Sequence, residues 1–77
     1  MPPKLTRVSG AAAIRALERL GFVRTRQQGS HVIMRKQTAE GSLMCVVPLH
    51  RKPIPIGTLH SMLRQADLTP EEFLEHL

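Results

Sequence analysis

The sequence predicts an α+β fold in which helices cover one face of a three-stranded antiparallel sheet and leave the other face open. Apolar residues recur at helical spacing in residues 13–20 and 59–66, and three short apolar stretches separated by turn residues lie between them. The 77 residues are expected to form one domain, because a chain of this length has no room for a second core.

The first helix is expected to follow Ser9, a good N-cap residue, and to end at Gly21, which supplies a left-handed C′ position. Its apolar positions are Ala13, Ile14, Leu17 and Leu20. Strands are then expected at residues 22–27, 30–36 and 43–47, with turns at residues 28–29 and 39–41. The third stretch is the most apolar, and its lone Cys45 is expected to pack as a small buried hydrophobic residue.

Three prolines exclude regular structure across the basic loop 49–52. The next helix is expected to begin near Gly57 or Thr58. Its apolar positions are Leu59, Met62, Leu63 and Ala66. Residues 69–72, Thr-Pro-Glu-Glu, form a capping box that should open a last short helix carrying Phe73, Leu74 and Leu77.

Charge is distributed unevenly along the chain. The net charge is +5, but four of the six acidic residues lie in the last eleven positions, so residues 1–66 carry eleven basic groups against Glu18 and Glu40, a net +9. Such a segment attracts polyanions, and we favour nucleic acid over a merely solvated basic surface. No apolar run is long enough for a signal peptide or a membrane span, so a cytoplasmic protein is expected.

Several chemistries find no support in the sequence. The four histidines (His31, His50, His60 and His76) are scattered and lack the acidic neighbours of a metal site, and most acidic residues lie near the C-terminus. Ser30 and His31 are adjacent on a strand, so they point to opposite faces and cannot act as a serine–histidine pair. With only two aromatic residues, Phe22 and Phe73, the chain should contact nucleic acid mainly through phosphate and sugar.

His31 is the strongest candidate for chemistry, because it lies at the head of a strand just after the Gln28-Gly29 turn. If Val32 and Met34 face the helices, alternation sends His31, Ile33 and Arg35 to the open face. An imidazole beside a guanidinium suits acid–base catalysis on a phosphodiester. The alternative is an exposed strand histidine with no role, and spacing alone favours that alternative.

Other polar residues suit binding better than catalysis. Arg24 and Arg26 are expected to share a strand face and to contact phosphate, while Phe22 belongs to the core. His50 suits a phosphate contact better than a second acid–base role. Ile33 on the open face is either covered by a loop or part of a protein interface.

The chain resembles the HicA toxins, also called YcfA-like proteins, over essentially its whole length. The motifs that carry the resemblance are Gly21-Phe22, Gly29-Ser30-His31, Val47-Pro48-Leu49-His50, Gly57-Thr58-Leu59, Leu63-Arg64-Gln65-Ala66 and the segment 68–73. The resemblance implies a fold like that of double-stranded-RNA-binding domains. It also implies a toxin of a type II toxin–antitoxin pair that cleaves messenger RNA without the ribosome, with His31 as the catalytic histidine.

The resemblance further implies a partner antitoxin, HicB, that covers His31. The toxin is expected to be a monomer alone and a hetero-oligomer with its antitoxin, to need no cofactor or metal, and to contact the antitoxin through Gly29, His31 and Ile33. The residues expected to bind RNA are Arg24, Arg26, Ser30, Arg35, Lys36, His50, Arg51 and Lys52. The alternative function is a non-catalytic RNA-binding module on the same scaffold, in which His31 only contacts sugar or phosphate.

Overall fold

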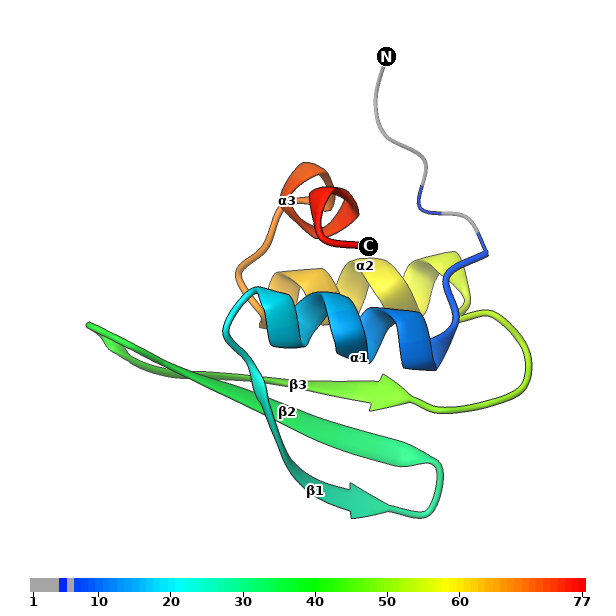
Figure 1. The fold of residues 1–77 in the computed structure, drawn as a ribbon, viewed down its shortest axis with the longest axis horizontal. Helices are drawn as coiled ribbons and strands as arrows, with labels where there is room; N and C mark the ends of the chain where they lie inside the picture. Colours follow the sequence, from blue (N-terminus) through cyan, green and yellow to red (C-terminus); the bar gives the residue numbers. More distant parts are fainter. Residues whose placement is uncertain (1–4, 6) are drawn as a thin grey trace.

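A computed structural model describes residue 5 and residues 7–77. Its elements, in chain order, are α1 (Gly10–Arg19), β1 (Val23–Gln28), β2 (His31–Thr38), β3 (Gly41–Pro48), α2 (Ile56–Gln65) and α3 (Pro70–Glu75) (Figure 1). The order of one helix, three strands and two helices confirms the predicted α+β fold. It also agrees with the double-stranded-RNA-binding-domain-like architecture that the family resemblance implies.

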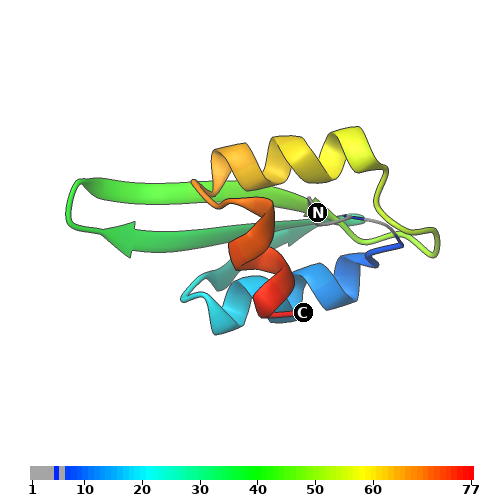
Figure 2. The same ribbon diagram turned by 90° about the horizontal axis from the view of Figure 1, so that it is seen from above.

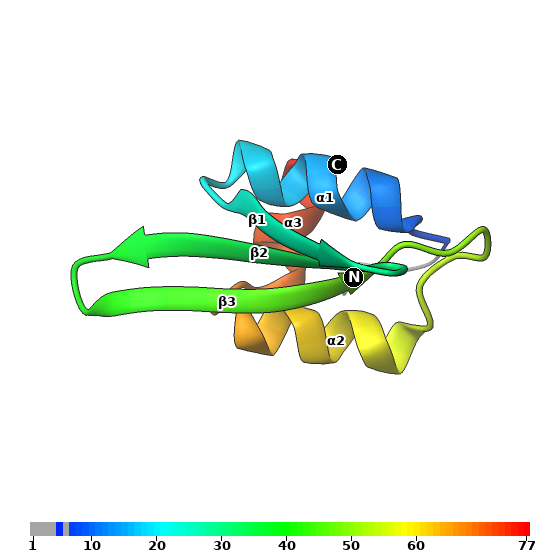
Figure 3. The same cartoon turned by 90° about the horizontal axis from the view of Figure 1, so that it is seen from below.

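The three strands form one antiparallel sheet in the order β1-β2-β3, so β2 is the central strand. Helices α1 and α2 pack on one face of the sheet, and α3 lies across them on the side away from the strands (Figures 1 and 2). Every helix in the described part of the chain belongs to this side. The opposite face of the sheet is therefore open, and α2 runs along the outer edge of β3 (Figure 3).

The core lies between the helices and the covered face of the sheet. Val32 and Met34 of β2 and Cys45 and Val47 of β3 are completely buried, as the alternation of the strands requires. The helices contribute Ile14, Leu17, Leu59, Met62, Leu63 and Phe73, and Phe22 follows α1 into the same cluster. The predicted positions of Phe22 and Cys45 in the core are confirmed.

Local signals at the helix ends agree with the sequence. The Ser9 hydroxyl accepts a hydrogen bond from the Ala12 N–H (3.1 Å) and caps α1. Gly21 has a φ of +101° and closes a Schellman motif, in which the Phe22 N–H donates to the Leu17 carbonyl (2.9 Å). The predicted capping box joins Thr69 and Glu72 in both directions at the start of α3.

Two helix boundaries differ from those predicted. Helix α2 begins at Ile56, slightly before Gly57 or Thr58, because the Pro55 carbonyl accepts the first helical hydrogen bond from the Leu59 N–H. Ile56 is half exposed, so it lies off the apolar stripe that located the helix. Leu77 lies beyond the end of α3 and is also about half exposed, so it contributes little to the core.

The pattern of β1 is interrupted by a bulge. Arg24 is paired with Met34 and Arg26 with Ile33, which leaves Thr25 without a partner in the ladder. The Thr25 hydroxyl donates to the Ile33 carbonyl (3.2 Å) and so holds the bulge against the central strand. The expectation that the two arginines share a face is wrong, because the extra residue turns Arg24 toward the helix side and Arg26 toward the open face.

Candidate active site

His31 is held at the start of the central strand by a tight turn. Only Gly29 and Ser30 separate the end of β1 from the start of β2, and Gly29 has a φ of +57°, which favours glycine at the first position of such a turn. His31 is exposed, whereas Val32 and Met34 are buried beneath the helices. The prediction that His31 lies on the open face is therefore confirmed.

The strand register arranges the open face in three rows. Each row contains one residue from β1, one from β2 and one from β3. The rows are Gln28–His31–Pro48, Arg26–Ile33–Val46 and Val23–Arg35–Met44. The His31 row therefore lies next to a row that contains a guanidinium, and Arg35 follows in the third row. Apolar side chains fill much of the remaining face, and Val23 and Met44 are the most exposed of them, at 60% and 44%.

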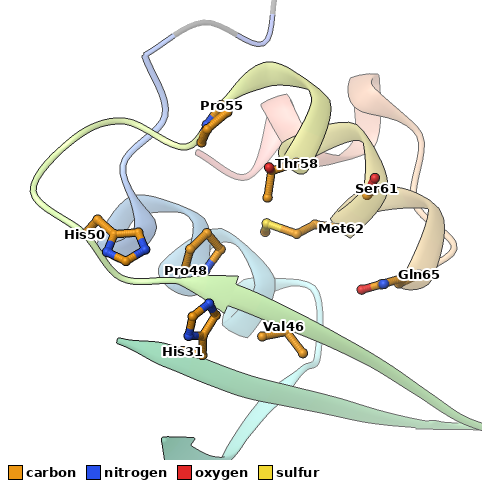
Figure 4. Close-up of a pocket in the computed structure, with 9 residues that line it drawn as sticks. All are labelled: His31, Val46, Pro48, His50, Pro55, Thr58, Ser61, Met62 and Gln65. Atoms are coloured by element: carbon orange, nitrogen blue, oxygen red, sulfur yellow. The ribbon is translucent and has the colours of Figure 1, made fainter. Parts of the chain in front are cut away.

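A groove of about 410 Å³ lies where the open face meets α2. His31, Val46 and Pro48 form its floor, and the His50 ring stands at one end (Figure 4). The opposite wall consists of Pro55, Thr58, Ser61, Met62 and Gln65. The volume falls in the usual range for sites that bind small molecules.

The α2 wall was not predicted as part of the site. Thr58, Ser61 and Gln65 are spaced by three and four residues, so they form one uncharged polar stripe beside the apolar stripe of the helix. That stripe was visible in the sequence. Its position over the groove was not, because it depends on α2 packing along the edge of β3.

The basic loop after β3 forms a second hollow of about 370 Å³. It shares Pro48, His50 and Pro55 with the groove and adds Arg51 and Lys52, both of which are exposed. A chain of phosphates leaving the groove past His50 would therefore meet these two cations next.

Backbone contacts hold both ends of this loop. The Leu49 N–H donates to the Ser30 carbonyl, and the Ile54 N–H donates to the Val8 carbonyl (2.8 Å). Helix α1 also packs directly on the end of β3, where a β-carbon at Gly10 would overlap the Pro48 carbonyl oxygen. These contacts fix where the chain passes His50.

The family model described as the HicA toxin of bacterial toxin–antitoxin pairs matches residues 10–68. The chain belongs to the HicA toxin family. No curated protein matches it. The match spans every element from α1 to the end of α2, and therefore includes both sides of the groove. This HicA toxin is thus the toxin of a toxin–antitoxin pair, which implies an antitoxin partner.

Two of the cations expected to bind RNA lie away from the groove of the toxin. Lys36 faces the helix side of the sheet, with its Nζ 5.9 Å from the centre of the Phe22 ring. Arg24 is turned to the same side by the bulge. Ser30 is half-buried beneath the loop, where its carbonyl accepts the Leu49 hydrogen bond.

The titratable groups of the groove are its two histidines. Among the described residues that line it there is no carboxylate and no other ionisable side chain. Across residue 5 and residues 7–77, no three histidine, cysteine or acidic side chains are grouped so as to hold a metal ion. Over the same residues, no helix is long and apolar enough to cross a membrane.

Proposed function

We propose that this HicA toxin is an endoribonuclease in which His31 is the general base. The observation that carries the proposal is the position of His31 on the floor of the groove, exposed, at the rigid start of the central strand. An imidazole gains and loses a proton near neutral pH, so it can accept one from a substrate hydroxyl. The tight turn and the strand pairing fix the backbone from which that ring projects.

The simplest reaction uses the 2′-hydroxyl of the RNA itself. His31 accepts the 2′-hydroxyl proton, the 2′-oxygen forms a bond to phosphorus, and the bond from phosphorus to the 5′-oxygen breaks. The products are a 2′,3′-cyclic phosphate and a 5′-hydroxyl end. Arginine or lysine side chains beside the phosphate stabilise the charge that develops on its oxygens.

Four exposed cations are placed to hold the RNA. Arg26 and Arg35 lie on the open face in the rows that follow His31, and Arg51 and Lys52 lie in the loop at the other end of the groove. This arrangement supports a path for the phosphate backbone from the sheet, through the groove and over the loop. Binding through such contacts depends on charge more than on base sequence.

The antitoxin is proposed to cover the same face. Ile33 and Val46 are half-buried, and Val23 and Met44 are exposed in the next row, so the open face presents apolar side chains with Arg26 and Arg35 beside them. A partner with apolar side chains and carboxylates matches both features. Its binding would bury His31 and exclude RNA.

The proposal is tested by comparing wild-type toxin with His31→Ala and with His60→Ala. His60 is exposed on α2 outside the groove, so its loss removes a histidine without touching the site. The wild type and His60→Ala should cleave RNA and arrest growth in the absence of antitoxin, while His31→Ala should do neither. Each substitution should change the free energy of unfolding by no more than about 0.5 kcal/mol. Full activity of a folded His31→Ala toxin would show that His31 is not the general base, and a wild type that binds RNA without cutting it would make this a binding module rather than a nuclease.

The nucleophile is tested separately with modified substrates. Cleavage should continue in excess chelator, should stop when the 2′-hydroxyl is replaced by a 2′-methoxy group, and should leave a cyclic phosphate that mass spectrometry detects. If 2′-methoxy RNA or DNA is cut at the normal rate, water is the nucleophile and the reaction above is wrong.

A further inference from the structure

A second imidazole shares the groove with His31. The rings of His31 and His50 have their centres 6.0 Å apart and their planes at 88°. Figure 4 shows them on either side of Pro48, with the α2 residues across the groove. At this separation both rings border the same part of the groove, so a single group bound beside them can lie within reach of each. Because a proton-transfer group must come within about 3 Å of the atom that it serves, two rings at this distance can reach two different oxygens of one phosphate.

The relative position of the two rings is set by the backbone. Pro48, two residues before His50, is paired with His31 in the β2–β3 ladder. The residue between them, Leu49, donates its N–H to the carbonyl of Ser30, which directly precedes His31. One ladder pair and one hydrogen bond therefore join the two histidine-bearing segments, and neither depends on a substrate being present.

The charged groups around His50 are cationic. Arg51 and Lys52 follow it in the loop, Arg26 and Arg35 lie on the open face of β1 and β2, and His31 is its nearest ionisable neighbour within the groove. The residues that β3 and α2 contribute to the lining are Val46, Pro48, Thr58, Ser61, Met62 and Gln65, all without charge. Among these described neighbours no carboxylate is available to pair with His50, so the ring is free to serve the substrate.

We infer that His50 is the general acid of the cleavage reaction. The inference rests on the proposed role of His31. As His31 accepts the proton of the 2′-hydroxyl and the 2′-oxygen bonds to phosphorus, protonated His50 gives its proton to the departing 5′-oxygen. The products are the cyclic phosphate and a neutral 5′-hydroxyl, with His31 protonated and His50 neutral. Proton exchange with water restores both rings.

The decisive experiment replaces the 5′-oxygen of the RNA, the leaving atom that His50 is inferred to protonate. Two RNAs are compared, the natural one and one with sulfur in place of the 5′-oxygen at a mapped cleavage site. A thiolate departs without a proton. His50→Asn keeps a hydrogen-bond donor but cannot act as an acid, so its kcat on natural RNA should fall by about 10²–10⁴-fold. On the sulfur-containing RNA the loss should be far smaller, whereas His31→Ala should be inactive on both.

His60→Asn is the matched control, because the same change is made at an exposed histidine outside the groove. It should behave as wild type on both substrates. An equal loss by His50→Asn on both substrates would identify His50 as a phosphate contact and overturn the inference, as would wild-type activity of His50→Asn. In either case an inactive His31→Ala leaves the proposed nuclease function intact. Activity of His31→Ala on natural RNA would reject both.

The pH dependence of kcat/KM for the wild-type toxin is a second test, and it does not depend on whether a variant folds. With one base and one acid, kcat/KM should rise and then fall with pH in a bell-shaped profile. In His50→Asn the falling limb at high pH should disappear, because no protonated acid remains to be lost. A wild-type profile that rises to a plateau with no falling limb would contradict the role of His50.

Discussion

Arg26 lies directly opposite Ile33 in the β1–β2 ladder, so its side chain emerges on the same face of the sheet as His31. The bulge at Thr25 makes this possible, because a regular strand would put Arg24 and Arg26 on one face. The same bulge directs Arg24 to the helix side. Two arginines separated by a single residue therefore have different surroundings, and this provides a matched comparison for RNA binding.

Arg26→Ala should weaken RNA binding more than Arg24→Ala, although both remove one positive charge. The measurement uses the His31→Ala background, so that the RNA stays intact, and follows affinity across a range of salt concentrations. Loss of one phosphate contact should flatten the logarithmic salt dependence by about 0.7 for single-stranded RNA. Arg24→Ala should leave the slope unchanged. Equal effects of the two changes would mean that only total charge matters and that the open face does not hold the RNA.

Ile33→Asp should weaken antitoxin binding, because it puts a charge at the apolar centre of the open face. We expect Kd to rise at least about tenfold, or about 1.4 kcal/mol. Arg7→Ala should have a smaller effect, since Arg7 is exposed in the segment before α1 and belongs to none of the strands. Titration calorimetry checks both changes. Saturating antitoxin should also abolish RNA binding, and a ternary complex of toxin, antitoxin and RNA would show that the antitoxin does not cover the groove.

Asp67→Gly should stabilise the toxin. Asp67 has a φ of +56° and ends α2 in the same Schellman geometry in which Gly21 ends α1, with the Leu68 N–H donating to the Leu63 carbonyl (2.9 Å). Glycine removes about 1 kcal/mol of left-handed strain, part of which is offset by its larger loss of entropy on folding, so a net gain of about 0.5 kcal/mol is expected in chemical unfolding.

Gly21→Ala is the reciprocal change and should destabilise by about 1–2 kcal/mol. Alanine at this position would have to keep a positive φ, which is unfavourable for a residue with a side chain. Its β-carbon would also lie 3.2 Å from Cε of Lys36. Stabilisation by Gly21→Ala, or destabilisation by Asp67→Gly, would show that backbone strain does not control these two helix ends.

Cys45 should resist alkylation in the folded toxin. Burial raises the pKa of its thiol from 9.0 to about 11, and the thiolate is the form that reacts. Iodoacetamide at pH 9 should therefore label native toxin far more slowly than unfolded toxin. Because the folded pKa is the higher one, this thiol contributes stability that is fully present below pH 9 and is lost as the pH rises toward about 11. Cys45→Ala should remove that part of the alkaline instability, and rapid native labelling would contradict the burial.

Much of the fold is encoded locally, and those parts were predicted from sequence. Ser9, Gly21 and Thr69 act within one turn of their own positions, so their capping roles could be deduced without a structure. The open-face position of His31 followed from two buried neighbours and the period of a strand. The role of His31 in catalysis remains a prediction.

The features of the fold and the site that could not be predicted from the sequence depend on contacts between distant segments. A bulge at Thr25 cannot be predicted in a strand whose residues are all exposed, because no buried residue marks the change of face. Lys36 and Arg35 are both expected from the sequence to bind RNA. Strand alternation puts Lys36 on the opposite face of the sheet from Arg35, above the Phe22 ring. The position of His50 beside His31 arises from ladder pairing and from a single hydrogen bond between Leu49 and Ser30.

The anchoring of the basic loop has an evolutionary consequence. Because backbone bonds at Leu49 and Ile54 hold its two ends, mutations can replace the exposed residues between them while the two imidazoles keep their spacing. Substitutions at Arg51 and Lys52 can therefore tune the strength of the proposed contacts with RNA and antitoxin without moving the histidines. A toxin built in this way can change how strongly it holds its partners while the geometry of its histidine pair is retained.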